Sequence, residues 1–396
     1  MILKKIKIKD IGRVVTGTTP ATKIQEYYGN EFDFIKPSYI EKGTRFFCES
    51  ETKLSTLAKE EYANTFVPPL STCVVTIGSI GEKMCLTKDV CLTNQQINTI
   101  IPNGNYDKVF IYYLMKHNLY KVKAANSGSS SGRENVSKSI FENLEVEVPD
   151  LISQQKISKI LSSYDDLIEN NLKRIKLLEE TAELIYKEWF VNFRFPGHEK
   201  CEFVDGIPKG WQNKSVLDDF DFIKGFEPGT KNYIYELEHD CIKFLRVGDL
   251  SGRDSNIYIS NQIEKKRIID IQDIVISLDG TVGVVKFGLS GAYSSGIRKI
   301  EIKNNLIGNM FTYCMMRSEK IQSTIIAYSK GTTIIHAGSS IEYMKYIYPE
   351  KYILESFNKL CEPIFKKILN LQLANEKLKE ARDILIPKLI MGEIEV

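Results

Sequence analysis

The 396-residue sequence lacks the features that mark several large protein classes. Its longest uninterrupted apolar run, from Val109 to Met115, spans seven residues, whereas a helix needs about 20 to cross a membrane. The first residues contain no apolar signal segment. The eight cysteines are scattered without a C-x-x-C pair, which argues against a disulfide framework and against a cysteine-based zinc site. These absences predict a cytoplasmic protein that is neither membrane-bound nor secreted.

The motifs of the common nucleotide and metal enzymes are also missing. The sequence has no G-x-x-x-x-G-K-[ST] loop, no G-x-G-x-x-G after a strand and no H-E-x-x-H. The four histidines, at positions 117, 198, 239 and 336, are far apart, so no metal site is expected. The Asp/Asn-Pro-Pro-Tyr/Phe signature with which amino-methyltransferases grip a flipped base is absent as well. We therefore expect a chain that has no catalytic site of its own.

One short segment does match a hydrolase motif. Gly128-Ser-Ser130-Ser-Gly132 fits G-x-S-x-G, in which a strained turn between strand and helix exposes the nucleophilic serine. Here the match follows a helical segment and lies in a low-complexity stretch, and its counterpart in the second half of the chain lacks the pattern. A polar loop that contacts phosphates or base edges explains this segment better than a hydrolase site does.

The composition is that of a folded protein with more than one domain. Hydrophobic residues make up 43% of the chain and charged residues 26%, as in ordinary globular proteins. The length is about two to three times that of a usual domain. The net charge of +2 excludes a strongly basic DNA-coating protein, but it allows a nucleic-acid binder whose basic groups lie on one face.

The chain repeats itself at a shift of about 200 residues, which indicates a duplicated architecture. Residues 155–190 and 355–390 share one apolar pattern, and residues 76–81 match residues 278–283 at a nearly identical shift. Each half thus consists of a globular region followed by a long helix, and the halves meet near Pro196 and Gly197. The predicted division is two globular domains, each followed by a helix, at residues 1–150, 151–196, 197–350 and 351–396.

The globular regions are predicted to be α+β. Short apolar runs bounded by Gly, Asn, Pro and Ser predict strands near residues 73–77, 97–101, 273–277 and 298–302. Longer patterns predict helices at residues 106–123 and 307–327.

The two long helices carry apolar seams with heptad spacing. Residues 153–190 contain neither Pro nor Gly and would form a rod of about 57 Å at 1.5 Å per residue. Two seams in one chain, related by a pseudo-twofold axis, predict an antiparallel coiled coil. Its register sets Asn171 against Asn375, a polar pair that would fix the alignment, whereas a slip by one heptad would oppose Asn171 to Arg382 or Ile368. Alternatively, each helix covers only its own globular region as an amphipathic surface helix.

These elements resemble a known family. Residues 149–157 lead into the first long helix, residues 188–193 leave it, and residues 382–394 form a characteristic tail. Their order, duplication and shift, over the whole chain, resemble the specificity (S) subunit of type I restriction-modification systems, the HsdS family. The resemblance implies two target-recognition domains that each read one half of a split, asymmetric DNA sequence, with the paired helices as a spacer.

The resemblance also implies partners. The helices would dock two adenine methyltransferase subunits, which bind S-adenosylmethionine, and the complex would recruit restriction subunits that use ATP and Mg²⁺. No cofactor is expected in this chain. The two globular regions are nearly neutral, with 19 basic and 17 acidic residues in 1–150 and 20 of each in 191–350. Most of the affinity for phosphates is therefore expected to come from the methyltransferase partners.

Candidate DNA contacts are polar side chains in the loops between strands, because Arg can pair with guanine and Asn or Gln with adenine. In the first half they are Lys36, Ser38, Tyr39, Arg45, Asn94, Gln95, Gln96, Asn126, Ser129, Ser130 and Arg133. In the second half they are Lys224, Arg246, Ser294, Ser295, Arg298, Thr332, Thr333 and His336. Two other functions stay open: a specificity subunit of a type II-like restriction-modification system, and a coiled-coil scaffold that binds protein rather than DNA.

Overall fold

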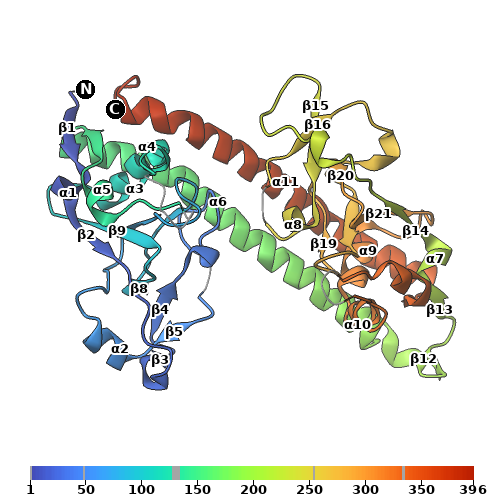
Figure 1. Cartoon of the computed structure of the whole chain (residues 1–396). Coiled ribbons are helices and arrows are strands. Elements are labelled where there is room, and N and C mark those ends of the chain that lie inside the picture. The colour runs from blue at the N-terminus through green and yellow to red at the C-terminus, as the bar shows by residue number, and fades with distance from the viewer. Residues whose placement is uncertain (1, 48–49, 127–133, 253–254, 332–334) are drawn as a thin grey trace. The chain divides into compact units, whose positions relative to one another are not determined.

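The computed structural model of the chain describes residues 2–47, 50–126, 134–252, 255–331 and 335–396 (Figure 1). Two compact units are present: unit 1 consists of Met1–Glu169 with Lys377–Val396, and unit 2 of Asn170–Glu376. Each unit combines short helices and β-sheets with one part of each of two long helices. The predicted α+β class with two long antiparallel helices is confirmed.

The described residues of unit 1 form two four-stranded sheets and a two-stranded one. The first sheet is antiparallel, in the order β2 (Gly12–Thr16), β9 (Ile97–Pro102), β6 (Thr72–Val75) and β7 (Met84–Leu86). The second is mixed, in the order β3 (Tyr28–Gly29), β5 (Lys53–Leu54), β4 (Phe32–Ile35) and β8 (Cys91–Thr93), and its β4 and β8 are parallel. The two-stranded sheet pairs β1 (Lys4–Lys7) with β10 (Glu145–Val148).

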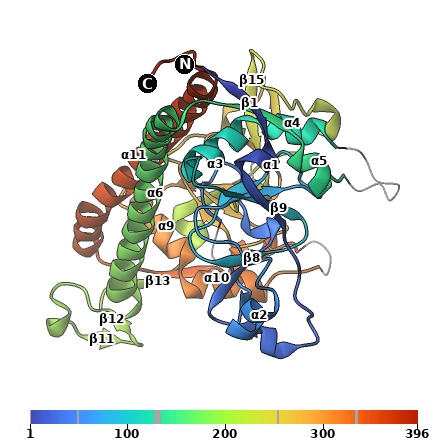
Figure 2. The same cartoon turned by 90° about the vertical axis from the view of Figure 1, so that its left-hand side faces the viewer.

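Short helices accompany the sheets of unit 1. They are α1 (Ile8–Ile11), α2 (Thr56–Glu61), α3 (Lys108–His117), α4 (Leu119–Ala124) and α5 (Lys138–Glu142). Helix α3 is buried along six consecutive residues, because one side packs on β6, β7 and β9 and the other belongs to the cluster formed with the long helices (Figure 2). The single helix predicted at residues 106–123 is in fact two helices. Asn118 ends α3 by donating its side-chain amide to the Leu114 carbonyl at 2.8 Å.

Unit 2 repeats this organisation. Its antiparallel sheet has the order β14 (Phe220–Lys224), β21 (Ile297–Ile302), β18 (Ile274–Ser277) and β19 (Val285–Lys286). Its mixed sheet has the order β16 (Tyr258–Ser260), β15 (Cys241–Leu245), β20 (Gly291–Tyr293) and β17 (Ile268–Ile269), with β15 and β20 parallel. Two further pairs are β13 (Gln212–Ser215) with β22 (Lys345–Tyr348), and β11 (Phe203–Val204) with β12 (Ile207–Pro208).

The short helices of unit 2 are α7 (Val216–Asp219), α8 (Val247–Leu250), α9 (Asn309–Arg317) and α10 (Glu319–Ala327). As in unit 1, the structure divides the helix predicted at residues 307–327 into two. The break is at Ser318, whose extended backbone ends α9 and begins α10.

The long helices are α6 (Leu151–Tyr186), continued by a π-helical turn at Lys187–Val191, and α11 (Lys351–Ile390). They pack antiparallel along their apolar seams. Within unit 1, Ile157 and Leu161 of α6 share a buried cluster with Leu389 of α11. Within unit 2, Ala182 of α6 shares a buried cluster with Phe357 of α11. The alternative in which each helix merely covers its own globular region therefore does not hold.

The register of the helix pair is visible at one polar contact inside unit 2. The side-chain amide of Asn171 donates to the side-chain oxygen of Asn375 at 2.9 Å, and both residues are buried. A facing asparagine pair sacrifices some apolar burial, but it stabilises the alignment in which both amides are satisfied. The one-heptad slip is not observed, since Arg382 lies against Asp165 within unit 1.

Candidate nucleic-acid interface

The candidate interface begins at a backbone crossing that both units share. Gly17, just after β2, donates its N–H to the first carbonyl of β9 at 3.1 Å, and Gly225, just after β14, donates to the first carbonyl of β21 at 3.2 Å. A Cβ at Gly17 would lie 2.2 Å from the Thr93 carbonyl oxygen, and one at Gly225 would lie 2.2 Å from that of Ser294. Because only glycine allows this approach, the chain crosses from one sheet to the other at the same place in each unit.

A polar turn adjoins the crossing. Asn94 donates its backbone N–H to the last carbonyl of β4 at 3.0 Å, and Ser294 donates to the last carbonyl of β15 at 2.9 Å. The residues that follow those two carbonyls are Lys36 and Arg246, which therefore occupy equivalent positions. The two units therefore have sites with the same backbone frame but different side chains.

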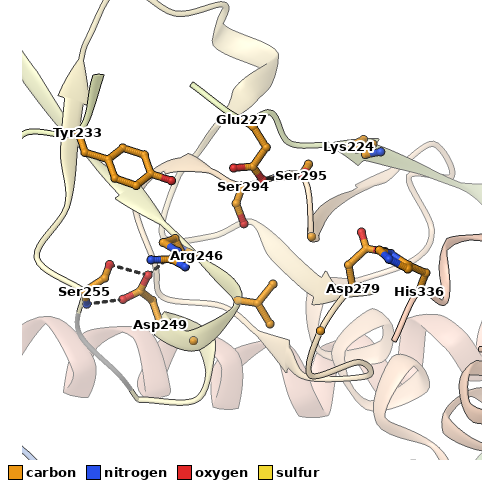
Figure 3. A pocket seen from close by; sticks show the side chains of 14 residues that line it. Lys224, Glu227, Tyr233, Arg246, Asp249, Ser255, Asp279, Ser294, Ser295 and His336 are labelled. Carbon is orange, nitrogen blue, oxygen red and sulfur yellow. Dashed lines mark hydrogen bonds and ion pairs between the residues drawn. The ribbon is translucent and has the colours of Figure 1, made fainter. Parts of the chain in front are cut away.

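In unit 2 the frame encloses a hollow of about 680 Å³ (Figure 3). It brings together five of the predicted contact residues, namely Lys224, Arg246, Ser294, Ser295 and His336. Sequence reasoning missed five other polar residues of its lining, namely Glu227, Tyr233, Asp249, Ser255 and Asp279. A signal for one of them existed, because residues 220–228 echo residues 11–20 and place Glu227 at the position of Thr19.

The three carboxylates of the hollow have different surroundings (Figure 3). Asp249 accepts the backbone N–H of Arg246 at 2.6 Å and both the N–H and hydroxyl of Ser255, so it is occupied at the start of α8. Asp279 is 2.7 Å from the Nδ1 atom of His336. Glu227 uses only Oε1, which accepts the N–H and the hydroxyl of Ser295 at 3.0 and 2.6 Å. Among the residues that the structure describes, its Oε2 atom has no hydrogen-bond partner.

Arg298, also predicted as a DNA contact, does not line the hollow. Its side chain is buried, donates to the carbonyls of Ser295 and Ile297, and has its Nη2 atom 3.5 Å from Asp279. Burial lowers the pKa of Arg298 from the usual guanidinium value, although the charge of Asp279 opposes the shift. In this conformation the guanidinium holds the polar turn in place and does not point to a ligand.

The site of unit 1 contains mostly neutral groups. Thr19 donates its hydroxyl to Oε1 of Gln95 at 2.6 Å, and both side chains are exposed. Asn94 donates to Oε1 of Gln96 at 2.9 Å, which leaves the Gln96 amide group at the edge of the turn. Lys36 approaches the Thr52 hydroxyl at 3.3 Å. The hydroxyl of Thr19, the amide of Gln95 and the ammonium of Lys36 thus stand where unit 2 has the carboxylate of Glu227, the hydroxyl of Ser295 and the guanidinium of Arg246.

The other predicted residues of unit 1 have varied positions. Ser38 and Tyr39 belong to the 3-10 helix Pro37–Tyr39 beside Lys36, and Ser38 is exposed. Asn126 accepts the backbone N–H of Asn135 at 3.1 Å. Ser129, Ser130 and Arg133, together with Thr332 and Thr333 of unit 2, lie outside the described residues.

Arg45 is turned toward α6. Its guanidinium is 2.5 Å from Asp166 and 2.9 Å from Glu169, and the side chain is only 9% exposed. Burial opposes the charged form, but the hydrogen bonds that Arg45 donates to Glu169 and Asp166 outweigh it and raise the pKa of Arg45. The residue therefore anchors a loop of unit 1 to the long helix in this structure.

Neither a metal-ligand cluster nor a membrane-spanning helix is found among the described residues. No three His, Cys, Asp or Glu side chains within these residues lie close enough together to hold a metal ion. No helix in this part of the chain is both long and apolar enough to span a bilayer.

Comparisons with known proteins agree on one family. Residues 3–180 match the family model for the type I restriction modification DNA specificity domain. The type I restriction enzyme MjaIX specificity subunit of Methanocaldococcus jannaschii is 30% identical over 415 residues, covering 98% of this chain and 93% of that protein. The HindI specificity subunit of Haemophilus influenzae is 23% identical, covering 79% of this chain and 84% of the relative.

A solved structure shows the same fold. The S subunit of a type I restriction-modification system from M. genitalium superimposes with a TM-score of 0.56 at 15% sequence identity, over 98% of this chain and 96% of that one. The full-length match to a relative at 30% identity, with this shared fold, leads to one assignment. The chain belongs to the specificity subunits of type I restriction-modification systems.

Proposed function

We propose that this chain recognises a DNA target in two parts, with the globular region of each unit reading one half. The observation that carries the proposal is the shared frame described above. Both units form the same glycine crossing and the same polar turn, yet place different hydrogen-bonding side chains on them. Recognition of an asymmetric sequence in two parts requires different side chains on the same backbone frame, because base edges are distinguished by their donor and acceptor patterns.

The chain itself is a non-catalytic component of its complex. We propose that two adenine methyltransferase subunits dock on it and that restriction subunits join the assembly in the cytoplasm. S-adenosylmethionine, ATP and Mg²⁺ would be bound by those partners. The near-neutral charge of both globular regions supports this division, because the counterion-release contribution to DNA affinity grows with the number of basic groups at the phosphates.

Mapping of methylated adenines in the source genome tests the proposal. We expect the methylated sites to share a two-part motif that disappears when the gene for this chain is deleted. Exchange of residues 1–150 for those of another specificity subunit should change one part of the motif and leave the other. If every methylated motif remains after the deletion, a role in target recognition is refuted.

A matched insertion tests the spacer. One heptad added to each of α6 and α11, where the chain passes between the two units, keeps both apolar seams in phase. Seven residues lengthen each helix by about 10 Å, the rise of about three base pairs of B-DNA. We expect the gap between the two half-sites to lengthen while both words stay the same. Changed words with an unchanged gap would contradict the proposal.

A further inference from the structure

The two units present opposite hydrogen-bonding groups at one equivalent pair of positions. Thr19 and Glu227 each lie two residues beyond the crossing glycine, and Gln95 and Ser295 each follow the first residue of the polar turn. In unit 1 the Thr19 hydroxyl donates to Oε1 of Gln95 at 2.6 Å. In unit 2 the Ser295 hydroxyl donates to Oε1 of Glu227, also at 2.6 Å. Each unit thus pairs a hydroxyl with a longer side chain. The longer side chain lies in the polar turn in unit 1 and just beyond the crossing glycine in unit 2.

The atoms left over differ in kind. In unit 1 the remaining group is the Nε2 amide of Gln95, which has two N–H donors. In unit 2 it is Oε2 of Glu227, which can only accept when ionised. Gln95 and Glu227 are exposed, and neither atom has another hydrogen-bond partner within the described parts of the chain. The hydrogen bond from the short hydroxyl orients each long side chain, so less rotamer entropy is left to lose on binding.

We infer that Gln95 and Glu227 are specificity-determining residues that read opposite base edges in the two halves of the target. The inference rests on the proposed function. Oε2 of Glu227 would accept a hydrogen bond from an exocyclic amino group, N4 of cytosine or N6 of adenine, and would repel the keto oxygens of guanine and thymine. The Nε2 amide of Gln95 would donate to those same acceptor atoms of guanine or thymine.

The neighbours of Glu227 agree with a role at a base edge. A carboxylate is repelled by the phosphate backbone, so an exposed acidic side chain inside a DNA-reading surface has to be explained by the bases. The other two carboxylates of the hollow are occupied by protein groups, namely Asp249 at α8 and Asp279 beside His336. Lys224 and Arg246 line the same hollow and are exposed, so they supply the positive charge that brings the phosphates close (Figure 3).

The test exchanges the two groups in the full-length chain. The chain is purified with the methyltransferase subunits that accompany it, and bound sequences are selected from a randomised duplex library. Glu227→Gln keeps an oxygen for Ser295 and replaces the free oxygen by an N–H donor. We expect one base position of one half-site to change from cytosine or adenine to guanine or thymine, with a swing in preference of about 5- to 100-fold. Gln95→Glu should make the converse change in the other half-site.

Controls separate this inference from the function on which it rests. Glu236→Gln removes another exposed carboxylate of unit 2 that does not line the hollow, and it should leave both words as they are. If the wild-type complex selects a two-part sequence and both exchanges leave every base preference unchanged, the inference is overturned while the function stands. If the wild-type complex selects no two-part sequence, the proposed function fails and the inference with it. Because the two variants lie in different units, either one can give the result if the other does not fold.

Discussion

The two units hold the same helix pair with different buried chemistry. In unit 1, Arg382 of α11 is 1% exposed and donates to Asp165 of α6. The equivalent residues of unit 2, 200 positions away, are Ala182 and Phe365. Phe365 packs there on Phe287, with ring centroids 4.3 Å apart. One position of the duplicated frame thus contains a buried ion pair in unit 1 and aromatic packing in unit 2.

A converse difference occurs at the entry to the antiparallel sheet. In unit 2, the backbone carbonyl of Asp219 accepts the N–H of Lys303 at 2.9 Å, and in unit 1 the Ile11 carbonyl accepts that of Asn103 at the same distance. These two positions are therefore equivalent, but a buried acid stands in one and a fully buried isoleucine in the other.

The comparison shows that the duplicated backbone tolerates either solution as long as each buried group is satisfied. In unit 1 Asp165 is on α6 and Arg382 is on α11, so both charges are neutralised only when α6 pairs with α11. Two copies of α6 paired in the same register would set Asp165 against Ala182 and leave the carboxylate buried and unpaired. The difference between the units thereby distinguishes α6 from α11, although the two helices share one apolar pattern.

The largest effect is expected when the base of unit 1 is removed. Arg382→Met keeps the length of the side chain but leaves Asp165 buried without its cation. Burial lowers the pKa of a guanidinium, but the contacts of Arg382 with Asp383 and Asp165 outweigh burial and raise it, so the arginine is charged in the folded chain. We expect the free energy of unfolding of unit 1 to fall by about 3–5 kcal/mol, measured by urea denaturation.

A matched substitution in the same helix pair provides the control. Arg174 of α6 is exposed, and Arg174→Met should change the free energy of unfolding by less than about 0.5 kcal/mol. A loss of similar size in both variants would mean that the destabilisation by Arg382→Met does not come from the loss of the buried ion pair.

Two substitutions convert unit 1 to the chemistry of unit 2. Arg382→Ala combined with Asp165→Phe introduces the two residues that unit 2 has at these positions, and it removes both buried charges together. We expect the double variant to recover about 2 kcal/mol of the free energy of unfolding lost in Arg382→Ala alone, because an apolar pair can replace a buried ion pair at little cost. A double-mutant cycle in urea measures the coupling. Additive losses would show that the two units do not share a common frame here.

Part of this pattern could be predicted from the sequence. The heptad spacing alone set Asn171 against Asn375, since a seam that runs through two helices leaves few alignments open. It also placed Arg382 on the seam but not its partner, because Asp165 lies beside a seam position and comes within reach only through the path of the side chain. Tyr113, which donates to the other oxygen of Asp165 at 2.5 Å, comes from α3 and has no local signal.

The candidate interface was predicted in the same uneven way. Strand ends and polar turns identified Lys224, Arg246 and Ser295, because loops between short apolar runs are recognisable from composition. Glu227 was missed, since an acidic residue argues against DNA contact until its free oxygen is seen. The mixed sheets were also missed, because their parallel pairs join strands that are distant in sequence and alternation within one strand does not identify its neighbour.

The smallest effect is expected at Asp219, and it depends on pH. Burial would raise the pKa of this carboxyl, but hydrogen bonds from Tyr346, Asn304 and Lys214, together with the charge of Lys214, lower it below 3.8. A lowered pKa means that the folded state holds the proton less tightly than the unfolded one. The contribution to stability is therefore complete above the unfolded-state pKa and is lost as the pH falls through the folded-state pKa.

Asp219→Asn should accordingly lower the free energy of unfolding of unit 2 by about 1 kcal/mol at pH 7, and the difference from wild type should shrink below about pH 4. Thermal unfolding followed between pH 7 and pH 3 measures this convergence. Asp221→Asn is the control, because Asp221 lies two residues away with its side chain 52% exposed in an ion pair with Lys303. Exposed pairs contribute little, so its curve should follow that of wild type throughout. If the Asp219→Asn curve also stays parallel to wild type down to pH 3, the charge of Asp219 does not stabilise unit 2. The carboxylate would then not be a functional difference from the isoleucine at the equivalent position of unit 1.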